Sequence, residues 1–219
     1  MASNRLERRP SPAQPQVLVR DGEGTSIDIQ LDKFISADGK HVANIGINLG
    51  SAQVPDRKYA ADLCAVFSDK GSVKILFGQQ RLDGKNLRTA VIVQMTVESA
   101  SRFLGTLTQA GGPLSEVNRF IAEKYPPEAL AKDVAEPQPG QIIALAANLA
   151  VVAMSDNEAC IDFYQASPFA LGLAFKTNKL ALEPVVRIDC RSTLFFGMTK
   201  GLADLGIKPM ELISKGDAS

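Results

Sequence analysis

The residue types that most often carry catalysis are sparse in this sequence. It holds one histidine, His41, and three cysteines, Cys64, Cys160 and Cys190. A metal site needs several ligands and a catalytic nucleophile needs a positioned base, and His41 has no companion of either kind. The cysteines form no C-x-x-C pair and lie within apolar segments, which is typical of buried free thiols in a reducing cytoplasm. We therefore expect neither a metal site nor a cofactor.

The glycine-rich stretches do not fit a nucleotide site. Gly46 to Gly50 and Gly105 to Gly112 lack the strand–glycine–helix setting of a dinucleotide site, and no G-x-x-x-x-G-K-[ST] occurs. One enzymatic alternative stays open, a polar site borne on the loop that carries Asp83, Lys85 and Arg88. Otherwise the sequence favours a protein that is not an enzyme.

Charge and composition narrow the partner class. The 219 residues include 24 basic and 24 acidic side chains, with a formal net charge of zero and no tryptophan. A balanced charge argues against a nucleic-acid partner, since such proteins carry a basic face, and few aromatics leave few stacking platforms. No apolar run is long enough to span a membrane. A protein partner or self-association remains.

The loop from Ala166 to Leu182 is the segment we predict to bind a partner. Its apolar content is unusual for a solvated loop, and Phe169, Leu171, Leu173 and Phe175 carry most of it. Two interpretations stay open. The loop either lies over a sheet as an extra strand, or it presents Phe169 and Phe175 as aromatic anchors.

The elements that position these residues centre on the stretch Tyr59 to Leu107. Tyr59 to Phe67 and Ser72 to Phe77 are apolar strands joined by the turn sequence Ser68-Asp69-Lys70-Gly71. Leu87 to Met95 alternates as a third strand. A helix follows at once, because Thr96 is a good N-cap and apolar residues recur at three- and four-residue steps.

The same order returns from Ala146 to Leu205. Ala61-Asp62-Leu63 matches Ala147-Asn148-Leu149. The same spacing along the chain links three further apolar pairs, which are Val66 with Val152, Ile75 with Ile161, and Phe77 with Phe163. A slightly longer spacing pairs the third strands and the helices, and the extra length falls in the loop Ala166 to Leu182. We predict an internal repeat.

Prolines and charge divide the chain. Residues 1–24 are proline- and arginine-bearing and predict a disordered tail, and residues 128–140 predict a linker. Residues 25–127 and 141–215 then form the first and second sheet-plus-helix units. A leading hairpin, Ser26 to Leu31 with Val42 to Leu49, is expected to extend the first sheet.

A resemblance rests on Tyr59-Ala60-Ala61, on Lys74 to Gly78 and on Val91 to Ala100. These segments resemble a family of short uncharacterised bacterial strand–strand–strand–helix proteins, whose members read Y-x-N/D, L-x-F-G and V-x-M-S-P-E-x-A at these places. The order of elements is also similar to that of the SecB-type export chaperones, which associate through their sheets and hold unfolded chains in apolar grooves. That similarity implies a SecB-like fold and a holdase activity as one alternative.

We therefore predict an α+β fold of tandem duplicated antiparallel β-sheet units, each covered by its own helix. The expected function is a non-enzymatic protein-binding or assembly module that works through sheet faces or apolar grooves. Self-association is expected through apolar residues assigned to one sheet face, namely Cys64, Val66, Ile92, Val152 and Met154. The alternative is that the two copies cover the apolar faces of each other within one chain.

Overall fold

The computed structural model describes residues 26–35, 41–47, 52–80, 87–124, 142–155 and 157–210. The predicted tail, 1–24, and the predicted linker, 128–140, lie outside these residues. Within the described part the fold is α+β, as the sequence predicts. It contains two mixed four-stranded sheets, one three-stranded sheet and four helices.

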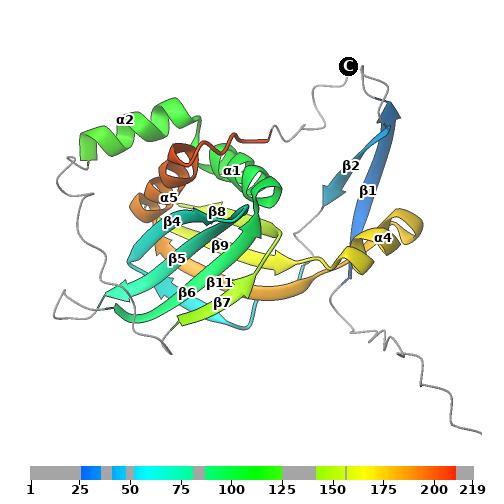
Figure 1. The fold of residues 1–219 in the computed structure, drawn as a ribbon, viewed down its shortest axis with the longest axis horizontal. Helices are drawn as coiled ribbons and strands as arrows, with labels where there is room; N and C mark the ends of the chain where they lie inside the picture. The colour runs from blue at the N-terminus through cyan, green and yellow to red at the C-terminus, as the bar shows by residue number, and fades with distance from the viewer. Residues whose placement is uncertain are drawn as a thin grey trace, which may run out of the picture.

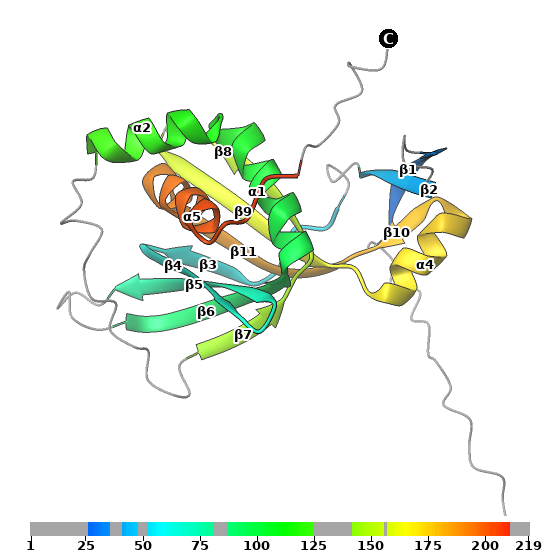
Figure 2. The same cartoon turned by 45° about the horizontal axis from the view of Figure 1, so that its top comes forward.

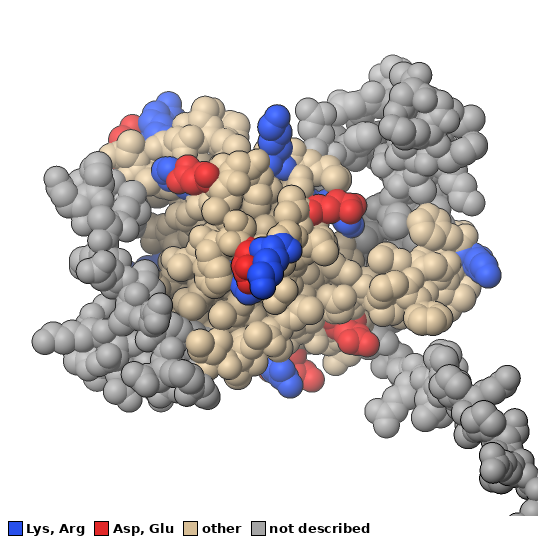
Figure 3. All heavy atoms as spheres, in the orientation of Figure 1, with Lys and Arg blue, Asp and Glu red and all other residues tan. Residues whose placement is uncertain are grey.

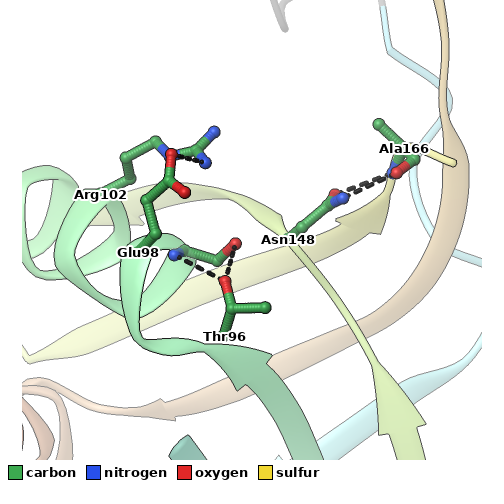
Figure 4. Close-up of polar contacts among 6 residues, drawn as sticks. Thr96, Glu98, Arg102, Asn148 and Ala166 are labelled. Atoms are coloured by element: carbon green, nitrogen blue, oxygen red, sulfur yellow. Dashed lines mark hydrogen bonds and ion pairs between the residues drawn. The ribbon is translucent and has the colours of Figure 1, made fainter. Parts of the chain in front are cut away.

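Three consecutive strands and a helix form the first half of the body. They are β4 (Leu63–Asp69), β5 (Ser72–Gln80), β6 (Leu87–Thr96) and α1 (Val97–Gly111), followed by α2 (Leu114–Lys124). The β4–β5 turn uses positive φ at Lys70 and Gly71. Strand β6 passes straight into α1 because the Thr96 hydroxyl accepts a hydrogen bond from the Ser99 N–H at 3.1 Å (Figure 4).

The second half repeats this order. Its elements are β8 (Leu149–Met154), β9 (Glu158–Gln165), β11 (Glu183–Arg191) and α5 (Ser192–Asp204). Between β9 and β11 the chain inserts α4 (Pro168–Thr177) and the short β10 (Lys179–Ala181). The predicted loop Ala166 to Leu182 is therefore mainly a helix, and its one strand does not lie in the second sheet.

The two halves exchange their leading strands. β3 (Lys58–Ala61) pairs in parallel with β11 of the second sheet, and β7 (Ile142–Ala146) pairs in parallel with β6 of the first. The sheet orders are thus β4-β5-β6-β7 and β3-β11-β9-β8. The prediction of purely antiparallel sheets is wrong for this reason, since each sheet ends in one parallel strand taken from the other half.

The exchange occurs at two matching bends. The predicted strand Tyr59 to Phe67 changes sheet at Asp62, whose N–H donates to the Gly78 carbonyl at 3.0 Å. Asn148 makes the equivalent bond to the Tyr164 carbonyl, also at 3.0 Å. The Asn148 side chain binds both backbone groups of Ala166, donating to its carbonyl at 2.7 Å and accepting from its N–H at 2.8 Å (Figure 4). Each bend is therefore anchored by hydrogen bonds to a neighbouring strand.

The helices do not each cover their own sheet, contrary to the prediction. α1 packs against β8 of the second sheet as well as β5 and β6, and α5 packs against β4 of the first sheet as well as β9 and β11. α1, α2 and α5 lie together on one side of the two sheets (Figure 2). A helix that follows an exchanged strand pair buries more of its apolar stripe by contacting both sheets.

One main core joins both halves. The largest side chains that are fully buried there come from strands of both sheets and from α1 and α5: Ile75, Phe77, Leu104, Leu107, Ile161, Phe163, Ile188, Phe195, Met198 and Leu202. Phe163 contacts Phe77 and Phe103, with ring centroids 5.9 and 5.3 Å apart. The core of each half is therefore completed by the other.

The leading hairpin does not extend the first sheet as predicted. β1 (Ser26–Ile35) pairs with β2 (His41–Ile47) and with β10, so these strands form the separate three-stranded sheet. Together with α4 they project from one end of the body (Figures 1 and 2). The apolar alternation of the hairpin predicts its two strands, whereas its partner, β10, is a three-residue strand that no periodicity reveals.

Candidate functional site

Helix α4 is the element that displays the predicted binding residues. Local signals define its ends. The Ser167 hydroxyl accepts from the Ala170 N–H at 3.1 Å, Pro168 stands in the first turn, and Asn178 closes the helix in a left-handed conformation with φ of 55°. These signals could have predicted the helix from the sequence, because Ser-Pro before an apolar run and Asn after it are helix boundaries.

One side of α4 holds it to the body. Ala174 is fully buried, and Ala170 and Leu171 are half-buried against a small second core. The other buried members of this core come from the end of β9 and from the segment around β10, namely Tyr164, Ala166, Leu180 and Leu182. Leu171 is therefore a packing residue of α4 and does not belong to its exposed side.

The rest of α4 carries three exposed apolar side chains, of which Phe169 and Leu173 lie opposite the packed side, whereas Phe175 lies at its border near Leu171. Phe169 is 81% exposed, Leu173 54% and Phe175 41%. Phe169 and Leu173 lie one turn apart, and a Cβ built on Gly172 between them meets nothing within 4 Å. The only charged residue of the helix is Lys176, and the surface over α4 is largely free of charged side chains in Figure 3. We call Phe169, Leu173 and Phe175 the α4 surface.

The outer face of the first sheet is a second apolar region. Strand register places on it a row that runs from β4 to β7: Leu63, Ala65, Leu76, Ile92 and Ala144. Leu76 is buried beneath its neighbours although it points away from the main core. We call this row the outer strip.

The sequence assigned residues to this face incorrectly. Cys64, Val66 and Val152 pack against the main core, and of the five residues predicted for self-association only Ile92 belongs to the outer strip. Strand alternation separates two faces but does not say which face a helix will cover.

The outer face of the second sheet differs because it carries a charged pair beside the apolar residues of the second core. Arg187 on β11 and Asp162 on β9 form a two-pronged ion pair with both N–O distances 2.6 Å, and Asp162 is only 7% exposed. The hydrogen bonds that Arg187 donates to the Asp162 carboxylate raise the pKa of the Arg187 guanidinium. Both charged groups are thus engaged with one another, which makes this a structural pair.

The three thiols are poor nucleophiles. Burial raises the pKa of Cys64 far above its usual range, that of Cys190 to about 12 and that of Cys160 to about 11, with the nearby Asp162 adding to the effect at Cys160. A thiol is reactive only as the thiolate, so these cysteines stay protonated near neutral pH.

The described residues show no catalytic constellation. They contain no group of three or more histidine, cysteine, aspartate or glutamate side chains able to hold a metal ion. His41 begins β2. Of the alternative enzymatic loop, Arg88 lies in β6, while Asp83 and Lys85 fall outside the described residues.

A shallow depression of about 310 Å³ lies between the β4–β5 turn, the start of α1 and the end of α5. Its polar lining includes Ser68, Ser72, Ser101 and Lys208. The Ser101 hydroxyl donates to the Lys208 carbonyl at 2.5 Å, and no histidine or carboxylate lines the depression.

Among the described helices none has the length and apolar character needed to cross a membrane. Comparisons of the chain with protein-family models, with curated proteins and with solved structures gave no match.

Proposed function

We propose that this protein is a non-enzymatic protein-binding module whose α4 surface binds an apolar segment of another protein chain. The observation that carries this is the exposure of Phe169, Leu173 and Phe175 on a single short helix at the end of the body. Large apolar side chains that are exposed together are typical of interfaces. The buried side of α4 already holds the helix against the body. Folding of the chain therefore does not require Phe169, Leu173 and Phe175 to be buried.

The size of the α4 surface sets the strength of binding. Full burial of an exposed Phe or Leu contributes about 1.5–3 kcal/mol, so the three partly exposed residues together contribute about 4 kcal/mol. That is close to the lower end of the cost of association, so these residues act as an anchor that neighbouring contacts must supplement. We therefore expect reversible binding of micromolar strength.

We also propose that the two halves of the body arose by tandem duplication. The matching bends at Asp62 and Asn148, the repeated order of strands and the central Phe77–Phe163 contact support a tandem duplication. The strand and helix order supports a SecB-like arrangement, in line with the resemblance noted above. The three unpaired thiols support a cytoplasmic protein.

A second candidate is a holdase for unfolded chains. It is favoured by the presence of a second apolar region, since Ile143 of β7 is 54% exposed near the outer strip. A holdase would prevent the aggregation of a heated model protein at equimolar ratio, and Phe169→Ser with Phe175→Ser would weaken that protection. Protection that the double variant leaves intact would assign holdase activity to another surface.

The decisive experiment for the first proposal is site-specific photo-cross-linking in cells. A photoreactive phenylalanine analogue at position 173 should cross-link to an apolar segment of a protein partner, mapped by mass spectrometry. The same analogue at Glu123, exposed on α2, is the matched control. Affinity of the purified partner should fall at least about tenfold in the Phe169→Ser, Phe175→Ser variant, equivalent to about 1.4 kcal/mol. Equal cross-linking at positions 173 and 123, or an unchanged affinity, would overturn the proposal.

A further inference from the structure

The two four-stranded sheets have four edges, and three of them are protected. β4 has α5 packed against it, so that a Cβ on Gly201 would lie 3.1 Å from Val66, and β8 has α1 packed against it. β3 carries Lys58 directly after Pro55-Asp56-Arg57. Packed helices, charges and proline are the usual means by which edge strands avoid pairing with other chains.

Among the described residues, nothing gives β7 these protections. Its sequence, Ile142-Ile143-Ala144-Leu145-Ala146, contains no charge and no proline. Ile143 is 54% exposed and Ile142 36%, and no described strand pairs with its outer edge. An exposed apolar edge with unpaired backbone groups is a template for a further strand.

The backbone orientation of β7 follows from one hydrogen bond. The Ala147 N–H donates to the Gln94 carbonyl of β6 at 3.0 Å. Since the backbone groups of successive strand residues point alternately to the two edges, those of Ile143 and Leu145 also face β6. The N–H and C=O groups of Ile142, Ala144 and Ala146 therefore face the open edge.

We propose that β7 pairs with β7 of a second copy of this chain, antiparallel and centred on Ala144. In this register Ala144 exchanges both backbone hydrogen bonds with Ala144 of the second copy, and Ile142 does the same with Ala146. All the outward-facing groups are then satisfied by a twofold-symmetric arrangement. The two first sheets join into one sheet of eight strands.

The side chains favour a second copy as the occupant. On the outer face Ile142 lies opposite Ala146, a large residue against a small one, and Ala144 meets only itself. On the inner face Ile143 lies opposite Leu145. No like charges are brought together, and the outer strip continues across the junction. A five-residue strand pair is smaller than a standard interface, so we expect a weak dimer in the micromolar range.

The matching positions of the two halves suggest a substitution that tests whether β7 is the interface. At the spacing that pairs Asp62 with Asn148, the residue of β3 that matches Ala144 is Lys58. Ala144→Lys therefore installs on β7 the charge that β3 already has, on an exposed side chain. Ala144→Pro removes an outward N–H and leaves the β6–β7 hydrogen bonds in place. Ala60→Pro is the matched control, since the Arg57 carbonyl accepts from Arg187 and Ala60 thus faces outward on β3.

The test is the molar mass of the full chain by light scattering and sedimentation velocity over about a hundredfold range of micromolar concentration. Wild type and Ala60→Pro should shift from monomer to dimer, whereas Ala144→Lys and Ala144→Pro should stay monomeric with unchanged circular dichroism. A wild type that is monomeric at hundreds of micromolar, or an Ala144→Lys variant that still dimerises, would overturn the proposal.

A second measurement tests the register. Ala144→Cys should form an intermolecular disulfide, because the Cα atoms of a hydrogen-bonded antiparallel pair lie about 5.5 Å apart. Ala60→Cys should not. If Ala144→Cys also remains uncross-linked in a protein that dimerises, β7 is not the interface. The Phe169→Ser, Phe175→Ser variant should dimerise normally, so loss of α4 binding and loss of the dimer are separable.

Discussion

Phe77 of β5 and Phe163 of β9 meet with their ring centroids 5.9 Å apart, each at the same place in its own half of the chain. Both rings are fully buried. Their contact lies where the inner faces of the two sheets share one core, and Phe103 of α1 also packs on Phe163. Because β3 and β7 are exchanged, neither half has a complete sheet or a complete core without the other.

The first prediction is that the body unfolds in one cooperative transition and that Phe163→Ala shifts the whole of it. Truncating a buried Phe costs about 3–5 kcal/mol. Urea unfolding followed by circular dichroism should give one two-state curve for the wild type and one for the variant. Calorimetry of thermal unfolding should likewise give a single two-state transition for each protein. Phe67→Ala, at a partly exposed residue of β4, is the control and should cost about 1 kcal/mol or less. Two separate transitions would show that the halves are independent domains.

The second prediction concerns the bend at Asn148. Asn148→Ala leaves the N–H of the buried Ala166 without its partner and leaves the Ala166 carbonyl only the longer hydrogen bond from the Gln165 side-chain amide at 3.4 Å, which should lower the free energy of unfolding by about 2–3 kcal/mol. Thr177→Ala, at an exposed hydroxyl on α4, should change it by less than about 0.5 kcal/mol. Chemical denaturation measures both. A loss at Asn148 no larger than that at Thr177 would mean that its amide does not hold the bend.

The third prediction separates the two partners of the ion pair on the second sheet. Arg187→Ala leaves the nearly buried Asp162 carboxylate unpaired and should cost about 2–3 kcal/mol. The double change Arg187→Met with Asp162→Leu should cost less than the single change, because no buried charge remains. Equilibrium unfolding of the three proteins gives the comparison. A double variant that loses more than Arg187→Ala would show that the pair itself stabilises the sheet.

The fourth prediction is a dependence of stability on alkaline pH. The folded-state pKa values of Cys160 and Cys190 are raised from 9.0 to about 11 and about 12, so the folded protein holds protons that the unfolded chain releases. The contribution of these thiols is fully present below pH 9 and is lost progressively as the pH rises through 11 to 12. Unfolding midpoints from pH 7 to pH 11 should fall less steeply in Cys160→Ala, Cys190→Ala than in wild type. Parallel curves would contradict the assignment.

The fifth prediction contrasts the two sides of α4. Phe169→Ser with Phe175→Ser should change the melting temperature by less than the core substitution, since Phe169 is largely exposed and Phe175 is partly exposed. Ala174→Asp places a charge in the second core and should lower the melting temperature by several degrees, about 4 °C or more. Thermal unfolding followed by circular dichroism measures both variants. A large drop in the serine variant would show that the α4 surface is core, and the binding proposal would then be dropped.

Local sequence determined the strands β5, β6, β9 and β11 and the helices α1 and α5. Their signals act over a few residues: the turn at Lys70-Gly71, alternation along a strand, and the Thr96 cap. The matching order of strands in the two halves was also visible, since Ala61-Asp62-Leu63 and Ala147-Asn148-Leu149 match. The α4 residues proposed to bind a partner were identified by apolar content, although their strict alternation concealed a helix whose caps define it.

Only the tertiary structure decided which elements meet. Tyr59 to Phe67 is a continuous apolar run, and nothing local states that the chain changes sheets at Asp62. Pairing between β3 and β11 joins residues more than a hundred positions apart, so it depends on the energy of the assembled core. Alternation along the strands separates the residues of each sheet into two faces. The packing of α1 and α5 decided which of these faces became the interior.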